Sequence, residues 1–375
     1  MRILTVSSFF ESHGGGLEIV AGALARALAA RGHDSRHAAA ALSPTPTGSG
    51  VTRIALAAHD PLEALTGLPM PLPHRAARQQ LEEEVRAADA VVIHDALYAN
   101  SQLARRYARR YRKPWIVIQH IGAIPYRSPA LRAALAAANR LVTRPTLRAA
   151  SQTVFISDTV RSQFGGVAFA RPPVLMFNGV DASTFHPLDP AARRALRARL
   201  GLPEDRPQLL FVGRFVEKKG LAALRDLARL RPDCDLLLVG SGPIDPASWG
   251  LPNVRLPGRK SHAELAELYR AVDALVLPSV GEGYPLVVQE AMATGLPVYC
   301  GLDSALADPE AASFLTGVTV DPMHPAATAR SFADAISAIP LSRVNEAAAD
   351  YARRRYSWDS NAARIEEMFA ALAAS

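Results

Sequence analysis

Two glutamates, Glu282 and Glu290, lie eight positions apart in GEGYPLVVQEAMATG, residues 281–295. Pro285 between them suits the first turn of a helix, where its missing N–H costs nothing and its φ is already helical. The N–H groups around that helix start would point outwards and, with the positive end of the helix dipole, form a site for phosphate. These N–H groups belong to Gly283, Tyr284, Leu286 and Val287.

The two acids suggest hydroxyl groups on either side of the phosphate. Glu282 can accept hydrogen bonds from a sugar, and Glu290, about a turn and a half into the helix, can accept two from a ribose. A ligand with a sugar, a diphosphate and a ribose would engage the whole stretch. In a purely structural interpretation, Glu282 only complements the helix dipole and Glu290 lies on a solvated helix face. The spacing alone leaves both interpretations open.

Arg214 and Lys219 mark another strand-to-helix turn, in LLFVGRFVEKKG, residues 209–220. The strand ends at Gly213, and ligands of open α/β sheets bind beyond the carboxyl ends of strands. A guanidinium and an ammonium group converging there would neutralise a diphosphate and stabilise it as a leaving group. The alternative is ordinary exposed charge, which is common at this spacing.

The first strand-to-helix turn, in FFESHGGGLEIV, contains three glycines, and these allow the backbone to approach a ligand closely. Their spacing is not that of a dinucleotide fingerprint. His120, in VIQHIGAIPYR, ends an apolar strand at the same kind of sheet edge. It is either a structural histidine or a hydrogen-bond partner of the reacting sugar.

Short apolar runs alternate with segments of helical period, and these elements must position the candidate residues. Runs that are apolar on both faces and separated by helices predict parallel sheets with helices on each side. The runs are RILTVSSF, VTRIALA, DAVVIHD, WIVIQHI, TVFIS and VLMF, then QLLFVGR, DLLLVGSG, NVRL, ALVLPS, LPVYC and VTVD. Helices are expected near 17–31, 75–88, 101–112, 128–148, 219–230, 262–271 and 285–294. Two series of strands, separated by a break at Pro187 and Pro190, predict two doubly wound α/β domains.

Composition narrows the class of protein. The 375 residues are 49% hydrophobic and 21% charged, which is typical of a globular protein with sizeable cores. No apolar run reaches the ~18 residues of a membrane span, and the N-terminus lacks the pattern of a signal peptide. With two cysteines and no metal-ligand spacing around them, we expect neither a disulfide framework nor a zinc cluster, and a cytoplasmic location.

The net charge of +7 is concentrated in residues 1–170, which hold 20 basic and 11 acidic residues. Two segments there combine basic with apolar side chains. That pattern suits either the anionic inner face of a membrane or a solvated helix face in an arginine-rich protein. No nucleic-acid partner is expected, since no nucleic-acid module is recognisable. The basic residues are Arg105, Arg106, Arg109, Arg110, Arg112 and Lys113, then Arg127, Arg132, Arg140, Arg144 and Arg148.

Together these segments resemble the retaining glycosyltransferases of family 4, which have the GT-B architecture of two Rossmann-like domains facing a central cleft. The resemblance covers nearly the whole chain. Its motifs are GGGLEIVAGALARALAARGHD, FNGVDASTFHP, FVGRFVEKKG, LVGSGP, LVLPSVGEGYPLVVQEAMATGLPV and YSWDSNAARIEEMFAAL. It implies an acceptor-binding domain of residues 1–187, braced by the last helix at 359–375, and a nucleotide-sugar domain of residues 188–358.

The resemblance implies roles in the second domain. Glu282 would contact the donor sugar and Glu290 the ribose of the nucleotide. Arg214 and Lys219 would hold the diphosphate. No metal and no further cofactor would be required, because cationic side chains and helix ends would replace a divalent ion.

The resemblance also implies roles in the first domain. Gly15 and Gly16 would approach the diphosphate, and His120 would lie near the donor sugar. Retention would follow from front-face attack, in which the leaving phosphate helps to deprotonate the acceptor.

The sequence thus predicts an enzyme that moves a hexose from a nucleotide diphosphate sugar, UDP rather than GDP, to a hydroxyl acceptor. The acceptor would be a sugar, a lipid-linked or cell-envelope glycan, or a small molecule, reached from the cytoplasm and the inner face of the membrane. Two alternatives keep the fold. One is a non-catalytic binding partner. Degenerate copies of this kind would be expected to lose the acids or the Arg/Lys pair, and all four residues are present here. The other is a nucleotide-sugar epimerase.

Overall fold

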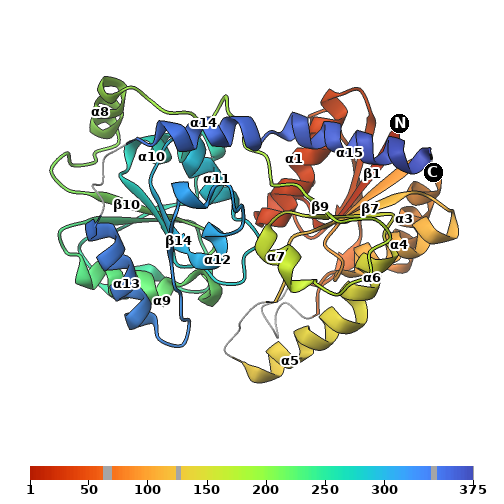
Figure 1. Cartoon of the computed structure of the whole chain (residues 1–375), viewed down its shortest axis with the longest axis horizontal. Helices are drawn as coiled ribbons and strands as arrows, with labels where there is room; N and C mark the ends of the chain where they lie inside the picture. Colours follow the sequence, from red (N-terminus) through yellow and green to blue (C-terminus); the bar gives the residue numbers. More distant parts are fainter. Residues whose placement is uncertain (62–69, 124–127, 339–343, 375) are drawn as a thin grey trace. The chain divides into compact units, whose positions relative to one another are not determined.

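The first apolar run forms the middle of a seven-stranded parallel sheet. The computed structural model describes residues 1–61, 70–123, 128–338 and 344–374, and the chain divides into two units (Figure 1). Unit 1 comprises Met1–Ala123, Ala133–Gly179 and Trp358–Ser375, whereas unit 2 comprises Ile124–Arg132 and Val180–Ser357.

The sheet of unit 1 has the order β3-β2-β1-β6-β7-β8-β9, with parallel pairing throughout. Its strands are β1 (Arg2–Phe9), β2 (Asp34–Ala40), β3 (Thr52–Leu56), β6 (Ala90–His94), β7 (Trp115–Gln119), β8 (Gln152–Phe155) and β9 (Val174–Leu175). β4 (Ala58–His59) and β5 (Leu72–Pro73) form a separate antiparallel pair. β2 is the one strand of this sheet that is absent from the predicted runs.

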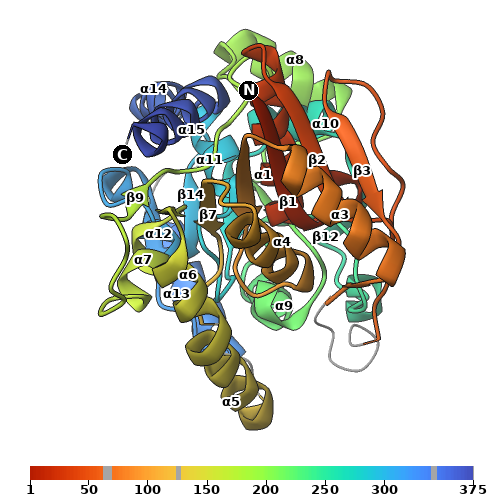
Figure 2. The same cartoon turned by 90° about the vertical axis from the view of Figure 1, so that its right-hand side faces the viewer.

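Helices cover both faces of this sheet, so its strands are apolar on both sides. On one face, Leu4 and Val6 share a buried core with residues of α3 (Arg75–Ala87), α4 (Ala99–Arg110) and α6 (Arg144–Ala149). Figure 2 shows α3 and α4 side by side in front of the strands. On the other face, Ile3 packs in a core with α1 (Gly16–Ala30) and α15 (Trp358–Ala373).

The single helix predicted at 128–148 is interrupted. α5 (Pro129–Ala138) is followed by a π-helical turn at Asn139–Thr143, and α6 then continues the chain. Pro145 explains the interruption, because it has no N–H to donate to the carbonyl of the preceding turn and its ring displaces that turn. A short helix, α7 (Asp158–Gln163), follows β8.

The sheet of unit 2 has the order β12-β11-β10-β13-β14-β15, again parallel. Its strands are β10 (Gln208–Val212), β11 (Asp235–Val239), β12 (Val254–Gly258), β13 (Ala274–Leu277), β14 (Val298–Gly301) and β15 (Thr316–Val318). Five of the six predicted runs are strands, whereas VTVD shares only Val318 with β15. Its helices are α8 (Pro190–Arg199), α9 (Leu221–Leu230), α10 (His262–Ala271), α11 (Leu286–Ala293), α12 (Leu302–Ala305), α13 (Pro325–Ala338) and α14 (Glu346–Arg355). The prediction of two doubly wound α/β domains is confirmed.

Candidate functional site

The strand order of each sheet reverses between two central strands, and doubly wound folds bind ligands at the carboxyl ends of such strands. In unit 2 the reversal lies between β10, which ends at Val212, and β13, which ends at Leu277. In unit 1 it lies between β1, which ends at Phe9, and β6, which ends at His94. Most predicted site residues follow one of these strands.

Glu282 and Lys219, from the loops after β13 and β10, form an ion pair with 3.1 Å between Oε1 and Nζ. The Nζ of Lys218 lies 3.6 Å from the same oxygen. Burial lowers the pKa of Lys219 despite its acidic neighbour. Burial raises the pKa of Glu282, but the two lysines outweigh it and bring that pKa down to about 2. One carboxylate and two ammonium groups therefore share a largely buried site with a net positive charge.

Two backbone contacts hold the loops of this site together. The N–H of Val280 donates to the carbonyl of Lys218 at 2.9 Å. Gly220 has a φ of 75° and packs so closely on Pro278 that a Cβ there would lie 2.2 Å from the Pro278 carbonyl oxygen. Glycine alone accommodates both this conformation and this approach. Lys218 and Lys219 reach Glu282 because of this tight turn.

Helix α11 begins at Leu286, one residue later than predicted. Pro285 is its N-cap residue, with a helical φ of −63° but an extended ψ of 129°. The first turn leaves the N–H groups of Leu286 and Val287 without intrahelical acceptors, while the N–H of Val288 donates to the carbonyl of Pro285. The positive end of α11 therefore follows directly after the Glu282 loop, as an anion site requires.

Glu290 is only 6% exposed, so the solvated-face interpretation of this residue is wrong. Its Oε2 accepts a hydrogen bond from the hydroxyl of Tyr269 at 3.1 Å. Burial raises the pKa of Glu290 to about 7, and the bond from Tyr269 opposes that shift. Tyr269 lies on α10, and its contact with α11 cannot be read from spacing along the chain.

Arg214 is exposed at the end of β10. Among the described residues, none forms an ion pair with it, while its positive charge helps to lower the pKa of Lys219, behind the larger effect of burial. The loop after β11 packs against the backbone next to Arg214. A Cβ on Gly240, whose φ is 147°, would lie 1.9 Å from the carbonyl oxygen of Gly213. The structure thus presents a guanidinium available for an anion beside the buried lysine.

His120, in unit 1, follows β7 and is 4% exposed. Its Nε2 lies 2.9 Å from Nδ1 of His94, and the two rings stack with their centroids 5.1 Å apart. Burial lowers the pKa of His120 to about 3 and that of His94 well below its usual value, so both rings are neutral. Since Nε2 of His120 is bound to His94, Nδ1 is the ring nitrogen left for a substrate hydroxyl. Sequence patterns did not single out His94.

Gly15 and Gly16 differ in what surrounds them. Gly15 is the N-cap residue of α1, and a Cβ there would lie 2.0 Å from Oε2 of Glu18. The carboxylate of Glu18, itself 6% exposed, therefore occupies that side of the helix start. Gly16 has no atom within 4 Å of its Cβ position. Of the two predicted glycines, only Gly16 has open space around its Cβ position.

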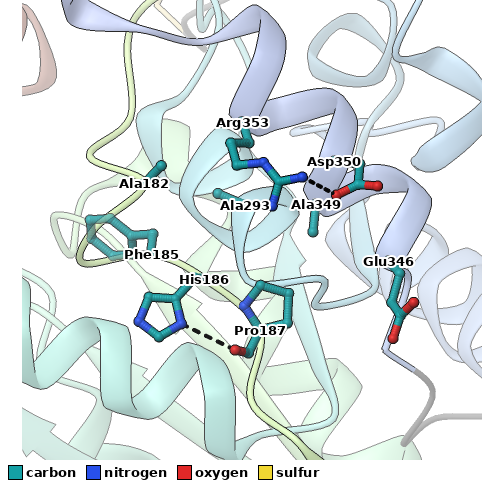
Figure 3. A pocket seen from close by; sticks show the side chains of 9 residues that line it. All are labelled: Ala182, Phe185, His186, Pro187, Ala293, Glu346, Ala349, Asp350 and Arg353. Carbon is teal, nitrogen blue, oxygen red and sulfur yellow. Dashed lines mark hydrogen bonds and ion pairs between the residues drawn. The ribbon is translucent and has the colours of Figure 1, made fainter.

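Unit 2 also contains two cavities, one apart from these acids and cations and one beside Lys218. One, of about 160 Å³, is lined by residues between 182 and 187, by the end of α11 and by one side of α14 (Figure 3). It contains an Arg353–Asp350 ion pair of 2.7 Å. The other, of about 290 Å³, is mostly apolar and reaches Lys218. Within the described part of the chain, no cluster of three or more His, Cys, Asp or Glu residues could hold a metal ion.

Comparisons with known proteins identify the family of the chain. Residues 14–184 match the family model described as Glycosyltransferase Family 4, and residues 192–355 match the one described as Glycosyl transferases group 1. A D-inositol 3-phosphate glycosyltransferase of Xylanimonas cellulosilytica is 34% identical over 215 residues, 51% of this chain and 49% of that protein. A sulfoquinovosyl transferase of Arabidopsis thaliana is 31% identical over 183 residues, 47% of this chain and 36% of that protein. The chain spans about half the length of the curated relatives it matches.

Solved structures share the fold. Sucrose-phosphate synthase from Thermosynechococcus elongatus superposes over 100% of both chains with a TM-score of 0.74 and 22% identity. Anabaena HepE, solved with UDP-glucose, covers 99% of this chain and 100% of its own, with a TM-score of 0.70 and 18% identity. With the two family models matched in order along the chain, the protein belongs to the GT-B glycosyltransferases of family 4.

Proposed function

We propose that the protein transfers a hexose from a nucleotide diphosphate sugar, with UDP as the preferred carrier, to a hydroxyl acceptor with retention of configuration. The observation that carries this proposal is the convergence of Glu282, Lys219 and the start of α11 where the strand order of unit 2 reverses. Relatives support the donor class, since Anabaena HepE was solved with UDP and with UDP-glucose.

Each charged group has a task in this reaction. Lys219 and Arg214 bind the diphosphate and neutralise the charge that develops on it as the bond from the anomeric carbon to the phosphate oxygen breaks. The N–H groups of Leu286 and Val287 add a fixed positive potential. Glu282, which the lysines keep ionised, accepts hydrogen bonds from the hexose hydroxyls.

Retention follows if the acceptor attacks on the face from which the diphosphate leaves. The acceptor oxygen forms the new bond to the anomeric carbon, and its proton passes to the departing phosphate oxygen. The neutral ring of His120 offers Nδ1 to a hydroxyl of the hexose. No step of this scheme uses a metal ion or a further cofactor.

We infer that the acceptor is a sugar, a small polyol or a lipid-linked glycan at the inner face of the membrane. Curated relatives named D-inositol 3-phosphate glycosyltransferases support a small hydroxylated acceptor. The basic segments of unit 1 favour an anionic surface. The transferred sugar is a hexose of the kind that nucleotide diphosphate sugars carry.

A binding screen tests the donor first. We expect UDP-glucose and UDP to raise the melting temperature more than GDP or ADP and their sugars, because a ligand that binds only the folded state stabilises it. Lys219→Ala and Glu290→Ala should abolish transfer, measured as release of UDP with an acceptor panel, while circular dichroism stays unchanged. Arg229→Ala, an exposed cation of α9, is the matched control and should retain full activity.

Two results would contradict the proposal. Full turnover in either site variant would overturn the assignment of the residues. Tight nucleotide binding without transfer to any acceptor would favour a non-catalytic binding partner, and a new nucleotide sugar formed without acceptor would favour an epimerase.

A further inference from the structure

Three buried side chains form a hydrogen-bonded chain that begins in the loop of Glu282. The hydroxyl groups of Tyr284 and Tyr356 lie 2.9 Å apart, and the hydroxyl of Tyr356 donates to Oδ2 of Asp308 at 2.9 Å. Because Tyr356 has one proton and gives it to the carboxylate, Tyr284 is the donor in the first bond. The chain therefore runs from Tyr284 to Tyr356 to Asp308.

Burial makes this chain stiff. Tyr284 is 2% exposed, and Tyr356 and Asp308 are each 1% exposed. Burial raises the pKa of both tyrosines well above its usual value, so neither loses its proton near neutral pH. A buried hydroxyl that loses its partner stays unsatisfied, and this makes a break in the chain costly.

The two ends of the chain lie at functionally different places. Tyr284 lies two residues after Glu282 and directly before Pro285, the N-cap residue of α11. Tyr356 lies at the end of α14, where the chain is about to leave unit 2 after Ser357.

Tyr356 also touches a second passage between the units. Its carbonyl accepts a hydrogen bond of 3.1 Å from the N–H of Val180, the residue at which the chain enters unit 2. The neighbouring residues are tightly packed as well, since a Cβ on Gly179 would lie 2.4 Å from the Trp358 ring. One residue, Tyr356, thus joins the donor loop to two of the places where the chain changes unit, at residues 179–180 and 357–358.

We propose that Tyr356 is a positioning residue for the donor loop and that it couples occupancy of this loop to the two chain passages at residues 179–180 and 357–358. The inference rests on the proposed function, because it takes the loop of Glu282 as the place where the sugar of a nucleotide sugar binds. A ligand that orders the loop stabilises the bond between Tyr284 and Tyr356, and by reciprocity an intact bond favours binding of that ligand.

Tyr356→Phe tests the coupling, and Tyr351→Phe is a matched control. Tyr351 also lies on α14 and donates to the same Oδ2 of Asp308 at 2.8 Å, but no hydrogen bond joins it to Tyr284 among the described residues. Amide hydrogen exchange is followed in the full chain, without ligand and with UDP-glucose. In the wild type, UDP-glucose should slow exchange both at residues 281–287 and at residues 179–181.

In Tyr356→Phe we expect about tenfold faster exchange at residues 281–287 without ligand, as for a lost buried hydrogen bond. UDP-glucose should no longer protect residues 179–181, and the donor KM should rise several-fold more than kcat falls. Tyr284→Phe should reproduce the effect on the loop. Tyr284→Phe/Tyr356→Phe should be no worse than Tyr356→Phe alone, because Tyr356→Phe already removes the bond to Tyr284.

The proposal is overturned if Tyr351→Phe and Tyr356→Phe speed exchange at residues 281–287 equally, since a general loosening of α14 would then explain both. It is also overturned if Tyr356→Phe leaves the loop unchanged in the absence of ligand. Failure of the proposed function looks different: UDP-glucose would then protect no residue of the wild type, while the measurements without ligand would still report on the hydrogen-bonded chain.

Discussion

The carboxyl group of Glu290 has its pKa near neutrality, because burial against α10 opposes ionisation more than the bond from Tyr269 supports it. Two vicinal hydroxyls can both donate to a carboxylate, whereas a carboxylic acid keeps a proton on one oxygen. The charge that Glu290 would need for the proposed binding of a ribose is therefore the charge that the folded protein disfavours. The same burial also makes the stability of the protein depend on pH. Because the pKa of Glu290 is about 7 in the folded protein and 4.5 in the unfolded chain, Glu290 makes the protein less stable as pH rises from 4.5 to 7.

We therefore expect the affinity for UDP-glucose to fall as pH drops through about 7, approaching a tenfold loss for each further pH unit. UDP-glucose is the suitable probe, because both of its phosphates are esterified and carry no proton near neutral pH. Isothermal titration calorimetry from about pH 5 to pH 8 measures the midpoint.

Tyr269→Phe separates this explanation from others. Loss of the tyrosine hydroxyl removes the bond that lowers the pKa of Glu290, so the midpoint should move to higher pH. Glu290→Gln should bind weakly with no midpoint near 7. A wild-type midpoint that stays in place in both variants would mean that another group titrates.

At the scale of elements, the turn between β10 and α9 brings the cations to the acid. Gly220 ends the short 3-10 turn Glu217–Lys219 in a left-handed conformation and begins α9. It also lies against the carbonyl of Pro278, directly after β13. The distance between Lys219 and Glu282 thus depends on a backbone contact that only glycine allows.

Gly220→Ala should destabilise the protein by several kcal/mol and raise the donor KM. An alanine there would cost about 1–2 kcal/mol for its left-handed conformation, and its Cβ would also clash with Pro278. Gly201→Ala is the control. Gly201 has a φ of 65° but no atom within 4 Å of its Cβ position, so it should lose only the strain and keep its KM. Chemical denaturation and donor kinetics compare the two; equal losses would show that the contact with Pro278 is unimportant.

The sequence allowed the elements around the site to be predicted to within about two residues, because buried parallel strands such as β10 and β13 are continuous apolar runs. Strand β2, DSRHAAA, was missed since alanine and polar residues favour no strand by themselves. Its place between β1 and β3 makes it a strand. Helices α13 and α14 were missed as well.

The site was predictable where its residues follow strand ends, as Glu282, Arg214 and Lys219 do. Tyr269 and His94 were not, because each meets its partner through packing between elements and not through spacing along the chain. Lys218 was overlooked in favour of its neighbour, although both ammonium groups lie close to Glu282. The burial of Glu290 also depends on α10, and the sequence around Glu290 does not predict it.

At the scale of the whole molecule, residues 96–157 contain eleven basic residues and no acidic one. Arg110 pairs with Glu82 of α3 at 2.9 Å, and Arg144 donates a hydrogen bond to the backbone carbonyl of Gln163 at 2.9 Å. Others remain exposed, namely Arg106, Arg109, Arg112, Arg140 and Arg148; Arg127 lies outside the described residues. Leu141 is 72% exposed in their midst. In the described segments, no helix is long and apolar enough to cross a membrane.

If these residues bind an anionic surface, the protein should float with liposomes of phosphatidylglycerol but not with those of phosphatidylcholine. Flotation should fall between about 0.1 M and about 1 M salt, as the Debye length falls from ~10 Å to ~3 Å. Arg140→Glu/Arg148→Glu should abolish it, whereas Arg229→Glu/Arg354→Glu, with the same change of charge in unit 2, should not. Equal flotation of both double variants would refute a specific basic surface.

The return of the chain to unit 1 at Trp358 limits how such an enzyme can be recombined. Ile365 and Phe369 of α15 are fully buried or nearly so and complete the core on one face of the unit 1 sheet, and Arg31 binds Glu366 at 2.7 Å. A fragment that stops at Gly179 would expose this face to water. A chimera that exchanges unit 1 between relatives must therefore transplant both ends of the gene together.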